Sequence, residues 1–244
     1  MGEAAGKARV TDGPAVAAGA AGGEVCDAER AAHARGEDRR PADGGARMIV
    51  GGPRGVRMVA VRDEWPDDPG AHPKVLVEQA CRVYGEARVA AWCADLLVRA
   101  VAYDDPDEPP LVWVGGSPAA HGLGEGWKDH WPRVWGARGL LYAWDPAAAA
   151  AVVRGLEDPS WRVREMCAKV ARARELGEAA DVLAGLVGDE VPRVRAAALR
   201  ALGVTGEGEH APVVRGALDD QESAVRQAAD KALEQLRGRL DRDV

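Results

Sequence analysis

Basic side chains in the second half of the chain are the residues whose type and spacing point to chemistry. They fall in segments that recur every 31 residues, and five of them lie on the side that turns away from the apolar face: Arg162, Lys169, Arg193, Arg200 and Lys231. A guanidinium holds a carboxylate or phosphate through two parallel hydrogen bonds, and arginine is common in binding hot spots. These residues therefore predict a basic stripe that binds a protein or an acidic peptide.

Bond-making chemistry has little support. The five histidines are scattered through loops and the N-terminal tail, and the four cysteines show no CxxC spacing. The sequence contains no GxSxG motif, no phosphate-binding P-loop and no paired catalytic cysteine and histidine. We therefore expect no catalytic residue, no metal and no cofactor, and a binding protein rather than an enzyme.

The elements that carry the stripe repeat at a fixed period. A Val-Arg pair recurs after 31 residues and then after 31 again, each time with an aspartate five residues before the valine. The three sets are Asp158 with Val163 and Arg164, Asp189 with Val194 and Arg195, and Asp220 with Val225 and Arg226. A period in this range is typical of a solenoid of stacked units.

Each repeated valine opens an amphipathic helix. Val194 is followed on one face by Ala197, Ala198, Ala201 and Leu202, at the spacing i, i+3, i+4, i+7, i+8, and the other two copies share this spacing. The small alanines let neighbouring helices approach closely. A first helix is expected before each valine, so each unit is a helical hairpin.

Two further features place the ends of the repeats. Asp145-Pro146 and Asp158-Pro159 each offer an N-cap residue followed by a proline, which predicts the start of a helix at both places. A divergent fourth copy is predicted upstream, with Val134 standing 29 residues before Val163. In this alignment Trp135 takes the place of the repeated arginine.

The segments DPSWRVREMCAKVA, DEVPRVRAAALRAL and DDQESAVRQAADKAL resemble HEAT repeats, in particular the short bacterial type found in phycobilisome-lyase proteins. The resemblance covers residues 128–236 well and 74–103 weakly. It implies an Asp–Arg ladder that ties repeat to repeat and caps helix ends. The matching positions here are Asp158, Asp189 and Asp220 with Arg164, Arg195 and Arg226.

The N-terminal half has a different organisation. Residues 1–47 contain no Leu, Ile, Trp, Tyr or Phe, so we expect a disordered low-complexity tail, and Met48 is an alternative start of translation. Residues 48–127 are predicted to form an irregular N-terminal subdomain. It would hold a short strand or hairpin at 48–62, a helical hairpin at 74–103 and, because of its prolines and glycines, no long helix at 104–127.

Tryptophan is concentrated where this subdomain meets the repeats. Six of the eight tryptophans lie between Trp113 and Trp161. Packing of the N-terminal region onto the first repeat accounts for such a cluster. The other interpretation is an exposed anchor for a partner, and for it we select Trp131 and Trp135.

These observations predict an all-α protein: an α-solenoid of about four HEAT-like hairpins over residues 128–240, after the irregular subdomain and the tail. The net charge of −7 argues against a generic nucleic-acid binder. No segment has the apolar length of a membrane span or the pattern of a secretory signal, so a cytoplasmic location is expected. Nothing in the sequence sets an oligomeric state.

Two other functions stay open beside the scaffold. HEAT-like alkylpurine DNA glycosylases grip DNA with a basic surface, but residues 128–244 balance 18 basic against 19 acidic groups, which suits phosphate contacts poorly. Bilin lyase activity is implied only by the name of the nearest repeat type. HEAT-like repeats also form deoxyhypusine hydroxylase, whose metal site uses His-Glu pairs, and no His-Glu dipeptide occurs in this sequence.

Overall fold

The computed structural model describes residues 65–103, 105–121 and 128–240. By its contacts the chain divides into two units, 1–57 and 58–244, and every described element belongs to the second. The predicted disordered tail at 1–47 and the predicted strand or hairpin at 48–62 lie outside the described residues.

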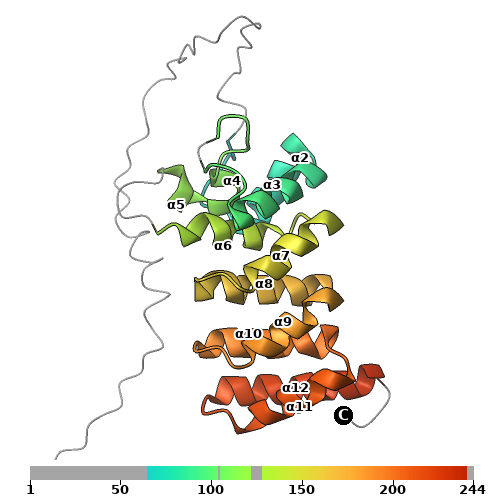
Figure 1. The fold of residues 1–244 in the computed structure, drawn as a ribbon. Coiled ribbons are helices and arrows are strands. Elements are labelled where there is room, and N and C mark those ends of the chain that lie inside the picture. The colour runs from blue at the N-terminus through green and yellow to red at the C-terminus, as the bar shows by residue number, and fades with distance from the viewer. Residues whose placement is uncertain (1–64, 104, 122–127, 241–244) are drawn as a thin grey trace, which may run out of the picture. The chain divides into compact units, whose positions relative to one another are not determined.

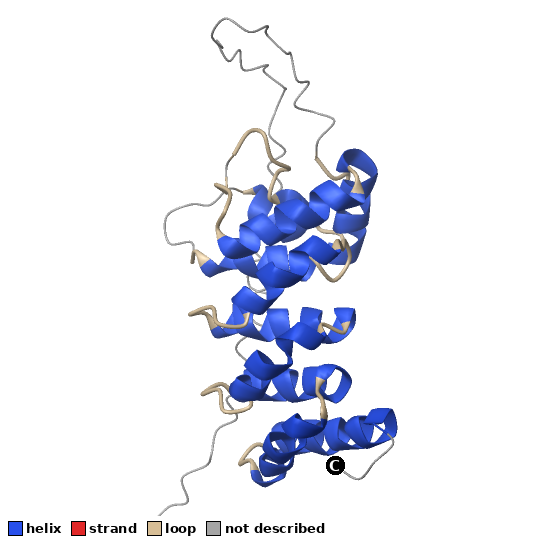
Figure 2. Ribbon diagram, turned by 45° about the vertical axis from the view of Figure 1, so that its right-hand side comes forward, coloured by secondary structure: helices blue, strands red, loops and turns tan. Residues whose placement is uncertain are grey.

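All regular elements of the described residues are helices (Figure 2). The first four are α2 (Pro73–Tyr84), α3 (Glu86–Val98), α4 (Val112–Gly115) and α5 (Ser117–Ala120). The others are α6 (His130–Gly139), α7 (Ala149–Gly155), α8 (Trp161–Arg174), α9 (Ala180–Leu186), α10 (Pro192–Thr205), α11 (Ala211–Gly216) and α12 (Ser223–Leu240). The hairpin predicted at 74–103 corresponds to α2 and α3, and the stretch at 104–127 holds the short helices α4 and α5.

The longer helix of each hairpin packs on the next. Helices α3, α6, α8, α10 and α12 contact one another in that order, and α7, α9 and α11 lie beside them as the first helices of the last three hairpins (Figure 1). Repeated valines fill the contacts, since Val163, Val194 and Val225 are fully buried. One apolar core runs from Val77 in α2 to Leu236 in α12, so the N-terminal helices share the interior of the repeats. The predicted all-α solenoid of HEAT-like hairpins is confirmed.

Two Asp-Pro pairs lie in the hairpin of α7 and α8, and they act in different ways. Asp145 caps the 3-10 helix Pro146–Ala148 that leads into α7, as predicted for the start of a helix, because its carboxylate accepts a hydrogen bond from the Ala147 N–H at 2.9 Å. The same prediction for Asp158-Pro159 is wrong. Helix α8 begins at Trp161, and the Asp158 carboxylate accepts the Ser160 N–H at 2.8 Å in a turn before the helix.

The first repeat lies in a different register from the one predicted. Arg133 makes the contact that Arg164 and Arg195 make in later repeats, and it precedes Arg164 by 31 residues. Pro132, rather than Val134, therefore corresponds to the repeated valine, and Trp135 does not replace the arginine. The alignment on Val134 was wrong because a proline stands at the anchor position.

Glycines let α6 approach α3. A Cβ atom on Gly136 would lie 2.6 Å from the carbonyl oxygen of Cys93, and one on Gly139 would lie 2.5 Å from the Cys93 sulfur. Both glycines stand 31 residues before a small or apolar buried residue of α8, Cys167 and Val170. The first repeat thus keeps the buried face of the others with less side-chain volume.

Candidate binding surface

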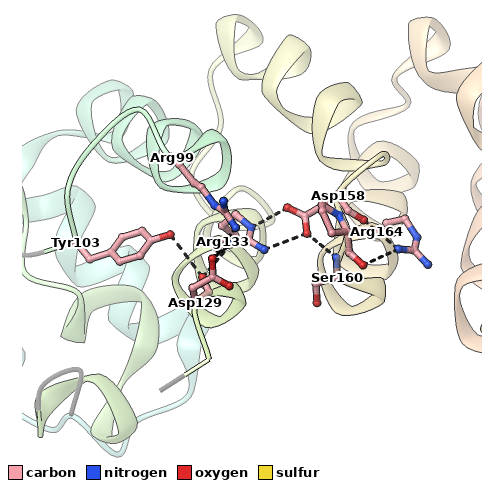
Figure 3. Close-up of polar contacts among 8 residues, drawn as sticks. Arg99, Tyr103, Asp129, Arg133, Asp158, Ser160 and Arg164 are labelled. Carbon is pink, nitrogen blue, oxygen red and sulfur yellow. Dashed lines mark hydrogen bonds and ion pairs between the residues drawn. The ribbon is translucent and has the colours of Figure 1, made fainter. Parts of the chain in front are cut away.

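Arginines and aspartates join successive repeats in a ladder (Figure 3). Each arginine donates through Nε and Nη2 to both oxygens of the aspartate 25 residues later. The pairs are Arg133 with Asp158 (2.7 and 3.1 Å), Arg164 with Asp189 (2.7 and 3.1 Å) and Arg195 with Asp220 (2.8 and 2.8 Å). The ladder predicted from the sequence contained five of these six residues and lacked Arg133.

The third nitrogen of each arginine binds the backbone before its own helix. Nη1 of Arg164 donates to the Asp158 carbonyl at 2.9 Å, and Nη1 of Arg226 donates to the Asp220 carbonyl at 2.7 Å. At the other end of the ladder, Asp129 receives Arg99 at 2.6 Å and Arg133 at 3.2 Å (Figure 3). The guanidinium groups of Arg133, Arg164 and Arg195 therefore stabilise the stack of repeats and are not available to bind a partner.

Charge pairing sets the ionisation of the ladder. The hydrogen bond from Arg195 lowers the pKa of Asp220 below its usual value, against the opposing effect of burial, and the Glu222 N–H adds to the lowering. For Arg133, burial disfavours the charge, but the hydrogen bond and charge of Asp158 outweigh burial and raise the pKa of the guanidinium. Both groups are charged at neutral pH.

Basic residues form a second series on the same row of helices, which we call the basic column. Its members stand 31 residues apart and occupy equivalent positions of α6, α8, α10 and α12: Arg138, Lys169, Arg200 and Lys231. Three of them belong to the predicted stripe. Arg138 was not included, because the alignment on Val134 placed it on the buried face.

The members of the basic column differ in what they already contact. Arg138 is half-buried and donates to the Val114 carbonyl at 2.7 Å. Lys169 pairs with Glu165 at 2.8 Å. Arg200 and Lys231 are exposed, and neither has an ion-pair partner in the described part of the chain. Among the described residues, the column members without an ion pair are thus those of α10 and α12.

Beside the column, guanidinium and indole groups alternate across three helices. The Arg162 guanidinium lies 5.7 Å from the ring centre of Trp131 on α6 and 4.4 Å from that of Trp161. The Arg193 guanidinium of α10 lies 5.3 Å from the same Trp161 ring. No carboxylate among the described residues pairs with Arg162, so its N–H donors are positioned by two indoles and left for another acceptor.

Glu165 links the two series. Its residue is only 8% exposed, yet its carboxylate contacts Lys169 at 2.8 Å and Arg193 at 3.1 Å. The stripe predicted from the sequence did not include this carboxylate. In the structure the carboxylate holds two of the predicted contact residues in place and neutralises part of their charge.

Trp135 does not belong to this surface, and its prediction as a partner contact is wrong. It is 4% exposed, and its ring stacks on Trp131 with 6.3 Å between ring centres. Trp131 itself is half-buried. Trp113 is also buried, so the cluster is in part the packing of α4 and α6 that the first interpretation described. Trp127 lies outside the described residues.

His130 adjoins Trp131 and responds to the same cations. Its ring centre lies 5.0 Å from that of Trp131. Burial, then the positive charges of Arg162, Arg133 and Lys128, lower the pKa of His130, while Asp129 opposes them. The ring is therefore neutral at pH 7, and the positive charge of this region comes from its arginines and lysines.

Within residues 65–103, 105–121 and 128–240, no three His, Cys, Asp or Glu side chains gather as a metal ion would require. No helix of the described residues combines the length and apolar character that crossing a bilayer needs.

The family of the repeats follows from the sequence once the ladder and its period are known. The HEAT-repeat family model matches residues 129–203 and 179–244. The chain is a HEAT-repeat protein. Among curated proteins, none matches it in sequence.

Two solved structures resemble this HEAT-repeat protein. Human deoxyhypusine hydroxylase in complex with glycerol is 25% identical over 48% of this chain and 41% of its own, with a TM-score of 0.41. This chain thus spans about two fifths of the hydroxylase. The complex of CpcE and CpcF of phycocyanin lyase from Nostoc sp. PCC7120 is 22% identical over 71% of this chain and 69% of its own, with a TM-score of 0.46. Both TM-scores lie below 0.5, so neither likeness assigns an activity to this chain.

Proposed function

We propose that this HEAT-repeat protein is a binding module for an acidic segment of a partner protein, held along α8, α10 and α12. The observation that carries the proposal is Arg162, which two indoles hold in place without a carboxylate partner among the described residues. A guanidinium whose plane is already positioned loses little freedom when it binds an anion. Arg200 and Lys231 extend this positive surface over the next two repeats.

We also propose that the protein acts in the cytoplasm. The thiols of Cys93 and Cys167 are free and fully buried, and burial raises the pKa of both, as expected for cysteines that serve as small apolar residues.

Charge reversal on the stripe tests the proposal. The probe is a fluorescein-labelled decaglutamate peptide, and binding is followed by fluorescence anisotropy at low salt. Changing Arg162, Arg193 and Arg200 together to glutamate is expected to abolish binding, while helicity and melting temperature stay near those of the unmodified protein. Undiminished binding would exclude the stripe as the site.

A matched variant separates the site from net charge. Arg154, Arg215 and Arg237 are exposed and belong to neither the ladder nor the stripe, and changing all three to glutamate alters the net charge by the same amount. This control is expected to keep most of the peptide binding. An equal loss in both variants would show that only overall charge matters. A duplex DNA probe in the same assay tests the nucleic-acid alternative, which requires binding that falls steeply with salt.

A further inference from the structure

The basic column has a fixed spacing along the stack. Lys169, Arg200 and Lys231 occupy one equivalent position on each of three helices that pack in sequence. Packed helices lie about 8 to 10 Å apart, according to the size of the side chains between them. At one contact between α10 and α12 the side chains are small: a Cβ on Gly203 would lie 3.2 Å from the Cα of Ala232. The backbone positions that carry the three cations are therefore spaced by about 9 Å, the distance between packed helices.

The spacing discriminates between backbone conformations of a partner. A β-strand returns a side chain to the same face about every 6.7 Å, and one helical turn advances 5.4 Å. A polyproline II helix has three residues per turn and rises about 3.1 Å per residue, so every third side chain returns to one face after about 9.3 Å. Of these three repeat distances, only that of the polyproline II helix matches the spacing of the basic column.

We propose that the occupant of the basic column is an extended polyproline II segment with an acidic residue at every third position, whose successive carboxylates bind Lys169, Arg200 and Lys231. This inference rests on the proposed function and names the partner's pattern. The segment crosses the helices instead of lying along one of them, so each repeat contributes one contact.

The structure also limits the length of the site. Arg138 stands in the same register, but its Nη2 already donates to the Val114 carbonyl at 2.7 Å. The column therefore offers three positions, one each on α8, α10 and α12. Lys169 contacts Glu165 at 2.8 Å, but its side chain remains 44% exposed, so its ammonium can still meet a second carboxylate.

Two peptides of identical composition test the spacing. One is three repeats of Glu-Pro-Pro, which places a carboxylate on one face at every turn of the polyproline II helix. The other carries three glutamates in a block followed by six prolines. The periodic peptide is expected to bind the full chain about tenfold more tightly than the block peptide, since it alone forms three weak ion pairs at once.

Arg200, the middle residue of the basic column, is the position to change. Changing Arg200 to alanine is expected to remove most of the difference between the two peptides, whereas changing the exposed Arg154 to alanine leaves it intact. Equal affinity for both peptides, or tighter binding of the block, would overturn the proposed pattern and leave the binding function standing. Binding of neither peptide, with decaglutamate also unbound, would overturn both.

Discussion

Each ladder arginine divides its nitrogens between two repeats. In Arg164, Nη1 donates to the Asp158 carbonyl ahead of its own helix, while Nε and Nη2 hold Asp189 of the next hairpin. The Asp189 carboxylate also accepts the Val191 N–H at 2.8 Å. One guanidinium thus connects the turn before its helix to the turn of the following unit, which sets the register of the stack more directly than apolar packing does.

Removing one ladder arginine should be costly because its aspartate is buried. The Asp189 side chain is 4% exposed, and replacing Arg164 with alanine would leave that carboxylate without its cation, which costs about 3 kcal/mol of the free energy of unfolding. Arg226 occupies the same place in the last hairpin and donates to backbone carbonyls, but it pairs with no carboxylate among the described residues. Its alanine variant is the matched control and should lose much less. Urea unfolding monitored by circular dichroism measures both, and equal losses would contradict the prediction.

Asp220 should make the free energy of unfolding depend on pH in the acidic range. Its pKa is lowered in the folded protein, so it stabilises the fold above its unfolded pKa of about 3.9, and this contribution is lost as the pH falls through the folded pKa. The Asp220→Asn variant is therefore expected to be less stable than the unmodified protein at pH 7, with a difference that shrinks below pH 4. Urea midpoints at several pH values check this. Asp219→Asn, at a neighbouring exposed residue without a ladder contact, should show no such convergence.

At the scale of the helix, close approach depends on glycine in a way that the apolar pattern does not reveal. Replacing Gly136 with alanine would place a Cβ 2.6 Å from the Cys93 carbonyl and force α6 away from α3, which costs about 2 kcal/mol. Gly185, inside α9, has no atom within 4 Å of its would-be Cβ, so its alanine variant should gain up to about 1 kcal/mol through helix propensity. Thermal unfolding of both variants measures these opposite effects. A Gly136→Ala protein as stable as the unmodified protein would contradict the prediction.

The same elements show which parts of the fold were readable from sequence. Val163, Val194 and Val225 recur in phase because each repeat must bury the same face, and that periodicity gives the helices and their packing side. The first repeat was predicted, but in the wrong register, because Pro132 stands where the valine would be and glycines replace apolar side chains. Glycine adds no apolar side chain to the pattern, so a helix contact that depends on glycine cannot be recognised from apolar periodicity.

The candidate binding surface could be predicted from the sequence only in part. Spacing placed Arg162, Arg193 and Arg200 on one side of their helices; in the structure Arg162 and Arg193 share the Trp161 ring, and Arg200 is exposed. Spacing does not report which charges neutralise one another, so the buried carboxylate of Glu165 between Lys169 and Arg193 was missed. The burial of Trp135 likewise depends on α4, which precedes the repeats and does not share their period.

At the scale of the described stack, each hairpin contacts mainly its neighbours, so a defect should spread according to its position. Val225 is buried in α12, which packs on α10, whereas Val194 lies in α10 between α8 and α12. An aspartate at either place buries an unpaired charge and should cost several kcal/mol. The Val225→Asp variant should then release only α11 and α12, while Val194→Asp separates α8 from everything that follows.

Hydrogen exchange read by mass spectrometry distinguishes these two outcomes. In Val225→Asp, faster exchange is expected over residues 208–240, with protection kept in α8 and α10. In Val194→Asp, faster exchange should extend from α9 to the end of α12, because α12 loses the helix on which it packs. Uniform loss of protection across α3 to α12 in both variants would instead mean that the stack unfolds as a single cooperative unit, and the nearest-neighbour account of its stability would have to be abandoned.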